Sequence, residues 1–293
     1  MPSLVVRMYQ HARVYDGADA LDVGVGSGYG CALLAKRLGD THVSSIDVDA
    51  YLAEVAARRL ERVGLHPRIA TCDATGPLPG TYDRIVSMVS VRPIPPGWLQ
   101  ALRPGGRLVT TVANTLMVVT ADKVDGRNIG MICGEQLLAV GRVERDCAGF
   151  METRSGQDYP PGLVGMFAAV RDQRGEQVTR GPYPVIDVDG CGELDSVLEV
   201  LAPGIEHRYE EADDGTRTAW MLHADGSWAR ASARGDEPPL VHQSGPRHLW
   251  DLFDEIRHYW LTHGYLQLYG ARAFITASGT IHLARGDWQA TIS

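Results

Sequence analysis

The chain has 293 residues, of which 44% are hydrophobic and 22% charged, and its formal net charge at pH 7 is −8. Its apolar runs fall well short of the roughly 18–20 residues that a transmembrane helix needs, and an acidic chain without a Lys/Arg run is a poor candidate for binding nucleic acid. The first residues show no basic stretch followed by an apolar region, so we expect a cytoplasmic protein without a secretory signal.

The first half of the chain alternates between helical and strand patterns. A helix is predicted where apolar residues recur at three- and four-residue spacing, and a strand where a short apolar run is bounded by turn residues. An Asp-Gly pair at 125–126, between apolar runs within 117–133, predicts a hairpin. These patterns predict an α/β fold with a doubly wound, mostly parallel, Rossmann-like sheet that ends in an antiparallel addition. The predicted helices are 3–13, 31–38, 50–63 (with Asp49 as N-cap) and 95–102, and the predicted strands are 20–23, 43–48, 68–72, 84–91 and 107–113.

The pattern changes after about residue 149. Pro- and Gly-containing pairs punctuate short apolar pieces, and the alternation of strand and helix is lost. We therefore divide the chain into a first domain over 1–150 and a smaller α+β domain over 151–293. The elements predicted in this half are a solvated loop over 210–215, a linker or long loop over 231–246, a helix over 249–263, and strands over 272–276 and 281–283.

The clearest functional signal is the segment 21–30, which reads LDVGVGSGYG. It follows a predicted strand and leads into a helix, where missing Cβ atoms let a ligand approach the backbone and the helix N-terminus offers N–H groups. Counted from either possible start, the third glycine of the dinucleotide fingerprint GxGxxG is replaced, by Tyr29 or by Cys31, which argues against a nicotinamide dehydrogenase. An acid two residues before GxGxG suits a ligand without a pyrophosphate, whose amino-acid amine would meet Asp22.

Two further acids stand at the ends of neighbouring predicted strands. Asp47 ends the second strand, where a carboxylate can accept hydrogen bonds from both hydroxyls of a ribose. Asp73 follows the third strand, although on its own it could equally be a turn residue. Because open α/β sheets bind ligands at the carboxyl ends of their strands, the three acids together predict an adenosine-bearing ligand.

The segments LDVGVGSGYG, SIDVD, CDA, YDRIVSMVSV and LRPGGRLV resemble those of class I S-adenosylmethionine-dependent methyltransferases, and within that class the protein-L-isoaspartate O-methyltransferase family. The resemblance covers about residues 2–115. It implies S-adenosyl-L-methionine as the cofactor and S-adenosyl-L-homocysteine as its product. The cofactor-binding residues that it implies are Asp22, Gly24, Gly26, Ser27, Gly28, Tyr29, Asp47, Val48, Asp73 and Ala74.

The second half resembles the C-terminal extension of one branch of that family, in 149–151 followed by Arg154, and in the GPRHLW segment at 245–250. Members of this branch are associated with ribosomally made, modified peptides such as lanthipeptides, lasso peptides and graspetides. The resemblance implies methylation of an aspartate carboxylate in a cyclised ribosomal peptide, leading through the methyl ester to succinimide or isoaspartate. Alternatives are a repair-type protein-L-isoaspartate O-methyltransferase, or a non-catalytic peptide-binding protein that keeps the donor fold. The tryptophans that could contact a peptide are Trp220, Trp228 and Trp288, although packing in the core is the favoured interpretation for each of them.

Methyl transfer to a carboxylate places few demands on catalytic groups. The carboxylate is already an anion at pH 7, so no general base is needed, and the protein's task is to position the reactants. Ser87, Ser90 and Arg92 stand at or just beyond the end of the fourth predicted strand and are the candidates for holding the substrate. Ser90 would donate to the carboxylate and Arg92 would pair with an acidic peptide, although each could also be an ordinary solvated residue.

Two other observations complete the interpretation. The five cysteines contain no CxxC pair, and His258 and His263 lack the four-residue spacing of a zinc helix, so reduced thiols and no metal are expected.

Family members carry a Ser/Thr-rich segment before the first helix that closes over the methyl donor. Here 1–4 leads directly into the helix, so either the natural start lies upstream or the site closes differently.

Overall fold

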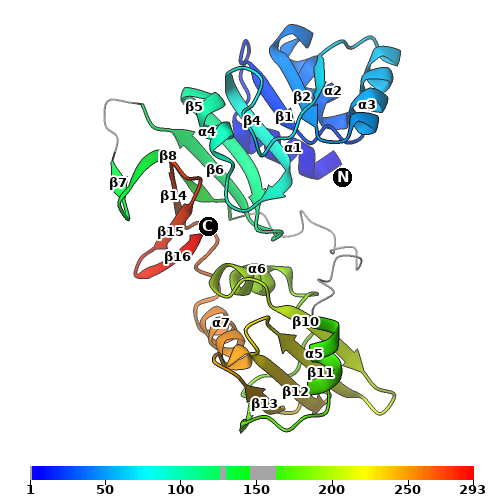
Figure 1. The fold of residues 1–293 in the computed structure, drawn as a ribbon, viewed down its shortest axis with the longest axis vertical. Helices are drawn as coiled ribbons and strands as arrows, with labels where there is room; N and C mark the ends of the chain where they lie inside the picture. The colour runs from blue at the N-terminus through cyan, green and yellow to red at the C-terminus, as the bar shows by residue number, and fades with distance from the viewer. Residues whose placement is uncertain (1, 126–129, 146–162) are drawn as a thin grey trace. The chain divides into compact units, whose positions relative to one another are not determined.

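The computed structural model describes residues 2–125, 130–145 and 163–293, and the chain divides into two units (Figure 1). Unit 1 is Met1–Phe150 together with Gln267–Ser293, and unit 2 is Met151–Leu266. The sequence assigned 267–293 to the C-terminal domain, which is wrong, because the strands of this segment extend the sheet of unit 1. Within the described ranges, no helix is long and apolar enough to cross a membrane.

Unit 1 is built on one mixed sheet whose parallel part has the strand order β3-β2-β1-β4-β5. The order reverses between β1 and β4, which is the arrangement of a doubly wound α/β fold. Fully buried Leu21, Ile46, Ile85 and Leu108, one from each of four neighbouring strands, form the centre of its core. The predicted fold class is thus confirmed. The parallel strands are β1 (Ala20–Val23), β2 (Val43–Asp47), β3 (Arg68–Thr71), β4 (Tyr82–Val91) and β5 (Leu102–Val112).

Helix α3 (Ala50–Arg62) begins and ends where the sequence places its capping residues. The Asp49 side chain accepts hydrogen bonds from the backbone N–H groups of Tyr51 (2.8 Å) and Leu52 (3.4 Å), as an N-cap does. Gly64 has a φ of 73° just beyond the end of the same helix, a conformation that glycine adopts without strain. The helices are α1 (Pro2–Ala12), α2 (Tyr29–Leu38), the 3-10 helix η1 (Asp40–His42), α3 (Ala50–Arg62) and α4 (Pro96–Ala101).

The rest of this sheet is antiparallel, in the order β5-β6-β8-β14-β15-β16, with β7 pairing β8. The predicted hairpin is wrong in its pairing, because β6 pairs with β8 and not with the apolar run before residue 133. Gly126 lies outside the described residues. The two-residue turn lies instead at Cys133-Gly134, where both residues have the positive φ that a type I′ turn requires. These strands are β6 (Val118–Lys123), β7 (Met131–Ile132), β8 (Glu135–Val143), β14 (Arg272–Thr276), β15 (Ile281–Arg285) and β16 (Trp288–Ile292).

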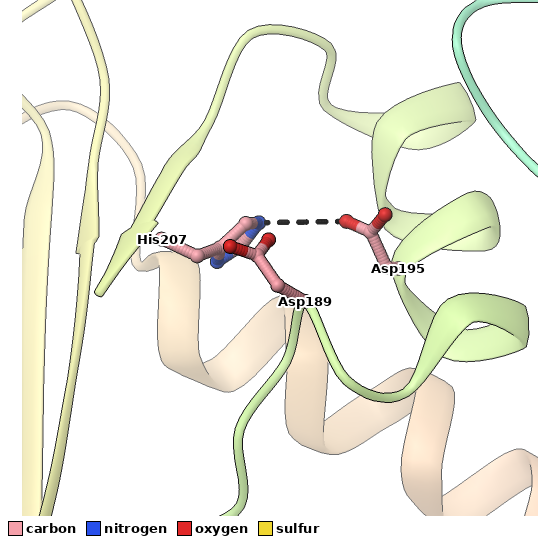
Figure 2. A group of neighbouring side chains, drawn as sticks. All are labelled: Asp189, Asp195 and His207. Carbon is pink, nitrogen blue, oxygen red and sulfur yellow. Dashed lines mark ion pairs between the residues drawn. The ribbon is translucent and has the colours of Figure 1, made fainter. Parts of the chain in front are cut away.

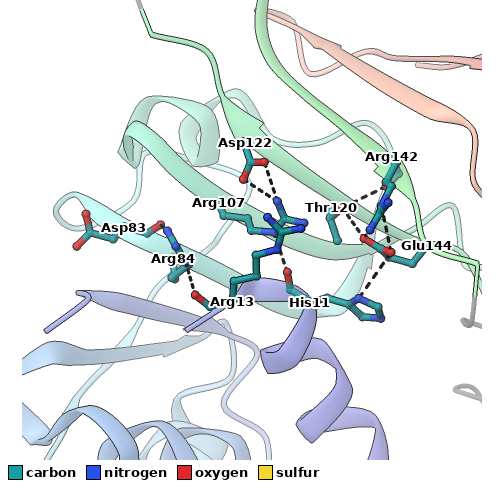
Figure 3. A network of polar contacts seen from close by, with 9 residues as sticks. All are labelled: His11, Arg13, Asp83, Arg84, Arg107, Thr120, Asp122, Arg142 and Glu144. Carbon is teal, nitrogen blue, oxygen red and sulfur yellow. Dashed lines mark hydrogen bonds and ion pairs between the residues drawn. The ribbon is translucent and has the colours of Figure 1, made fainter. Parts of the chain in front are cut away.

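Arginine side chains of the sheet in unit 1 bind the backbone at the C-terminal end of α1 (Figure 3). Nε of the buried Arg107 donates to the carbonyl oxygen of His11 at 2.7 Å, and its Nη1 donates to both carboxylate oxygens of Asp122 at 2.7 Å. Arg84 Nε donates to the carbonyl oxygen of Arg13 at 3.3 Å. Because the last carbonyl groups of a helix lack intrahelical partners, Arg107 satisfies one that α1 leaves open, and Arg84 holds the residue that follows the helix.

Replacing Arg107 by alanine is expected to destabilise α1 strongly. The change leaves a helix-end carbonyl and a carboxylate without their buried donor, at a cost of roughly 3 kcal/mol in the free energy of unfolding. Urea unfolding measures the total, and amide hydrogen exchange in α1 localises it. Arg272→Ala is the matched control, because that exposed arginine stacks on Phe274 and its loss should cost less than about 1 kcal/mol. Equal losses of unfolding free energy in the two variants would contradict the role of Arg107 in holding α1.

Unit 2 is built on a separate five-stranded antiparallel sheet with the order β10-β11-β12-β13-β9. This confirms a separate α+β fold in the second half. The predicted helix over 249–263 is confirmed as α7, and Gly264 with a φ of 71° ends it. The strands are β9 (Gln177–Arg180), β10 (Glu206–Glu211), β11 (Thr216–Leu222), β12 (Trp228–Arg234) and β13 (Leu240–Ser244), and the helices are α5 (Leu163–Val170), α6 (Gly192–Leu201) and α7 (Leu249–His263).

Several expectations for the second half are corrected. The predicted linker over 231–246 contains most of β12 and all of β13, where an exposed Leu240 and a buried Gln243 depart from the usual alternation of apolar and polar residues. By contrast, Trp220 and Trp228 are each only 4% exposed, and the Trp220 ring meets Phe167 edge-on with centroids 5.4 Å apart, so both pack in the core, which is the interpretation that the sequence favoured. Trp288 is half-buried on β16, in unit 1. The predicted loop over 210–215 is the hairpin between β10 and β11, but it starts inside β10.

Candidate functional site

The glycine loop after β1 has the backbone that its sequence predicts. Gly24, Gly26 and Gly28 have φ values of 88°, 47° and 83°, which residues with a Cβ atom rarely adopt. A Cβ on Gly24 would lie 2.9 Å from Cγ1 of Val89, whereas a Cβ on Gly26 would meet nothing within 4 Å. The loop therefore packs closely at Gly24 and leaves open space over Gly26, directly before the N-terminus of α2.

Residues 27 and 29 complete the turn into α2. Ser27 Oγ accepts from the backbone N–H of Tyr29 at 3.4 Å, and the Ser27 carbonyl accepts from Arg59 at 3.3 Å. Tyr29 is 41% exposed, so its ring is available to a ligand at this helix end. Its predicted contact with the donor stays a prediction.

Asp47 joins the end of β2 to the glycine loop. Its Oδ2 accepts from the backbone N–H of Gly26 and its Oδ1 from that of Asp49, both at 3.1 Å. The next residue, Val48, exposes 71% of an apolar side chain. An anionic hydrogen-bond acceptor, an open glycine and an exposed apolar surface thus meet at one edge of the sheet, which suits the hydroxyls of a ribose and the face of an attached base.

Asp22 lies beneath the same loop and is 1% exposed. It accepts hydrogen bonds from Ser45 Oγ at 2.7 Å and from the Tyr9 hydroxyl at 3.3 Å. Burial raises the pKa of Asp22 to about 6, and the charge of nearby Asp47 adds to the shift. Gly30 makes room for Tyr9, because a Cβ on it would lie 2.5 Å from the Tyr9 hydroxyl oxygen.

Sequence reasoning missed Tyr9 and Ser45. Tyr9 belongs to the helical pattern of α1, and Ser45 is an ordinary polar residue within a strand. Neither position carries a signal in the sequence, because their contact with Asp22 depends on how the elements pack.

Asp73 and Ala74 follow β3. Oδ1 of Asp73 accepts from both the backbone N–H (2.9 Å) and the hydroxyl (2.8 Å) of Thr75, and these hydrogen bonds hold the pKa of Asp73 below its ordinary value. The Ala74 carbonyl accepts from Trp98 Nε1 at 2.8 Å. The turn accounts for one oxygen of Asp73, and its contact with an adenine stays a prediction.

The candidate substrate-holding residues separate into two kinds. Ser87 is fully buried, and its hydroxyl binds the backbone N–H and carbonyl of Val89 where the pairing of β4 with β5 is irregular. Ser90 is half-buried at the end of β4, and its Oγ accepts from the backbone N–H of Asn114 at 2.7 Å, which leaves its own O–H to donate. Arg92 follows the strand and is half-buried. Ser87 therefore supports the backbone, whereas Ser90 has the better placement for a ligand.

Asn114 was not singled out from the sequence. It lies just beyond the end of β5, is exposed, and has a φ of 53° that asparagine tolerates better than most residues. Ser90 and Asn114 thus adjoin at the carboxyl edge of neighbouring strands, the edge at which doubly wound sheets bind ligands.

Comparisons with known proteins match this arrangement. Residues 1–143 match the family model "Protein-L-isoaspartate(D-aspartate) O-methyltransferase (PCMT)". The protein-L-isoaspartate O-methyltransferase of Hyperthermus butylicus is 32% identical over 125 residues, which covers 39% of this chain and 52% of that protein. The enzyme of the same name from Methanothrix thermoacetophila is 35% identical over 127 residues, which covers 41% of this chain and 60% of that protein. The chain thus spans little more than half the length of these relatives.

Solved structures give more distant matches. A structure titled protein-L-isoaspartate O-methyltransferase is 18% identical with a TM-score of 0.46, and the match covers 99% of this chain and 80% of that one. A putative enzyme of that name from Plasmodium falciparum, in complex with S-adenosyl-L-homocysteine, is 17% identical with a TM-score of 0.35, covering 42% and 64%. Residues 1–143 thus match the model of the protein-L-isoaspartate O-methyltransferase family over just under half of the chain, and they form a Rossmann-like domain whose methyl donor is S-adenosylmethionine.

Proposed function

We propose that the chain is an S-adenosylmethionine-dependent O-methyltransferase that esterifies the free α-carboxylate of isoaspartyl residues in proteins or peptides. The observation that supports this most is the pairing of Asp47 with the N–H of Gly26 beside an open loop, in a domain that matches the isoaspartate family. This is the repair-type alternative of the sequence interpretation, and the comparisons favour it over the peptide-tailoring one.

The chemistry needs positioning more than acid–base groups. A carboxylate oxygen attacks the methyl carbon in line, the C–O bond forms as the C–S bond breaks, and S-adenosylhomocysteine leaves as a neutral thioether. In this proposal the glycine loop, Asp47 and Val48 hold the donor, and the O–H of Ser90 orients the carboxylate. The methyl ester carries methoxide as its leaving group, which a carboxylate lacks. The next backbone nitrogen can therefore attack the ester carbonyl and displace methanol to give a succinimide, which water opens to aspartate or isoaspartate.

A second candidate is methylation of an aspartate in a ribosomal peptide. Unit 2 favours it, since this α+β unit lies entirely outside the matched residues and carries the GPRHLW segment at 245–250. Leu249 and Trp250 of this segment are fully buried at the start of α7, while Arg247 is half-buried and pairs with Asp225 at 2.9 Å. The other supporting residues, 149–151 and Arg154, lie outside the described residues.

Intact-mass spectrometry with S-adenosylmethionine distinguishes the candidates. The substrates are a linear isoaspartyl peptide, the same peptide with aspartate, and a cyclised ribosomal peptide encoded beside the gene. We expect one added methyl group on the isoaspartyl peptide only, followed by loss of methanol. Methylation of the cyclised peptide alone would establish the second candidate. Donor binding without methylation of any substrate would favour a non-catalytic peptide-binding protein.

Ser90→Ala tests the proposed substrate contact. Loss of one hydrogen-bond donor to the reacting group is expected to lower kcat/KM for the methylated peptide by roughly 10- to 100-fold. The affinity for S-adenosylhomocysteine, measured by calorimetry, should stay the same, because the donor lies over the glycine loop. An unchanged kcat/KM would remove Ser90 from this role, and a weaker donor affinity would place it at the donor site instead.

A further inference from the structure

Three side chains of unit 2 that can ligate a metal converge from separate segments (Figure 2). Asp189 lies on the loop before α6, Asp195 in the first half of α6, and His207 on β10. One ligand atom from each lies within 4.8 Å of the others. Asp195 and His207 are 8% and 5% exposed, whereas Asp189 is exposed. Two of the three side chains are therefore buried, and the third is in contact with solvent.

The distance between His207 and Asp195 fits a shared ion better than a direct hydrogen bond. Nε2 of His207 lies 3.7 Å from Oδ1 of Asp195, which is beyond hydrogen-bonding distance. Two ligands that each bind one zinc ion at about 2.0–2.1 Å in tetrahedral geometry are about 3.4 Å apart, so small side-chain movements would complete the coordination. Two carboxylates brought this close repel each other, and a divalent cation between them removes that repulsion.

We propose that Asp189, Asp195 and His207 bind a Zn²⁺ ion, with water in the fourth position. An imidazole ligand favours zinc over Mg²⁺ and Ca²⁺, which prefer oxygen ligands only. The ion would tie the loop before α6 to β10 and so stabilise unit 2. The sequence predicted no metal because that expectation rested on ligands of one helix, whereas these three come from a loop, a helix and a strand.

Metal retention by the full chain tests the site. Exposed Cys133 is first replaced by serine, so that its thiol does not bind zinc adventitiously. After equilibration with Zn²⁺ and removal of unbound ion, we expect one equivalent per chain and a higher Tm, with no comparable effect of Mg²⁺ or Ca²⁺. Co²⁺ should give the visible absorption of a four-coordinate site with nitrogen and oxygen ligands.

The variants Asp189→Asn, Asp195→Asn and His207→Gln should each weaken zinc binding at least about tenfold and abolish the Tm shift. His223→Gln is the matched control, because His223 also pairs with a carboxylate of unit 2, that of Asp225 at 2.9 Å, but lies outside the cluster. It should retain the zinc. Asp189 is exposed, so its variant keeps the test decisive even if the two buried changes prevent folding. Absence of bound zinc in the parent chain, or equal retention by Asp189→Asn, would show that the cluster is only a histidine–aspartate ion pair.

Discussion

Asp47→Ala is expected to weaken the binding of S-adenosylmethionine by roughly 100-fold. The substitution removes two anionic hydrogen bonds within the protein, to the N–H groups of Gly26 and Asp49, together with the proposed acceptor for the ribose hydroxyls. A hydrogen bond to a charged group contributes about 1.5–3 kcal/mol, and a 100-fold change in Kd corresponds to about 2.7 kcal/mol. Loss of the ribose contact alone thus accounts for the expected effect.

Calorimetry with S-adenosylhomocysteine provides the measurement, and the neighbouring acid provides the control. Asp49→Ala removes the N-cap of α3 and should lower the free energy of unfolding by about 1 kcal/mol, but it should leave the Kd within about threefold. Asp47→Asn keeps one acceptor oxygen and should fall between the parent chain and Asp47→Ala. Equal affinities for Asp47→Ala and Asp49→Ala would mean that Asp47 supports the loop and does not contact the donor.

The parts of the fold that sequence predicted are those fixed by neighbouring residues. The turn from β1 into α2 needs glycines with positive φ, and the start of α3 needs a short acceptor at Asp49, so both leave a local signal. The order of the parallel strands follows from the alternation of strand and helix, because crossover connections allow few alternatives. For the same reason the acid at the end of β2 could be placed beside the glycine loop from the sequence alone.

What sequence reasoning missed depends on contacts between distant segments. The return of 267–293 to the sheet of unit 1 is decided by the pairing of β14 with β8, more than 120 residues earlier in the chain. The aspartates and the histidine of the proposed metal site each have an ordinary local context, so only the packing of a loop, α6 and β10 reveals them.

The affinity for the methyl donor is expected to fall below about pH 6, because Asp22 must be ionised to attract a cation. Burial raises the pKa of this carboxyl to about 6 in the free protein, from an ordinary value of 3.8. S-adenosylmethionine carries a sulfonium and an ammonium, so it stabilises the ionised form, and its Kd should be constant above pH 6 and rise about tenfold for each pH unit below it. The Asp22→Asn variant should bind the methyl donor weakly, with no pH dependence in this range. Calorimetry from about pH 4.5 to about pH 8, which brackets the pKa of Asp22, measures the Kd of the parent chain and of the variant.

The same shift predicts an opposite effect on stability. Because the folded state holds the Asp22 proton more tightly than the unfolded chain does, the favourable contribution of this group is complete below about pH 3.8 and is lost as the pH rises through about 6. At pH 7 the buried carboxylate therefore costs about 2–3 kcal/mol, an order-of-magnitude value. Asp22→Asn should accordingly raise the free energy of unfolding at pH 7 while it weakens donor binding, a trade-off expected of a charge kept for its ligand. A variant that loses both stability and affinity at pH 7 would instead mean that the carboxylate serves the packing of Tyr9 and Ser45.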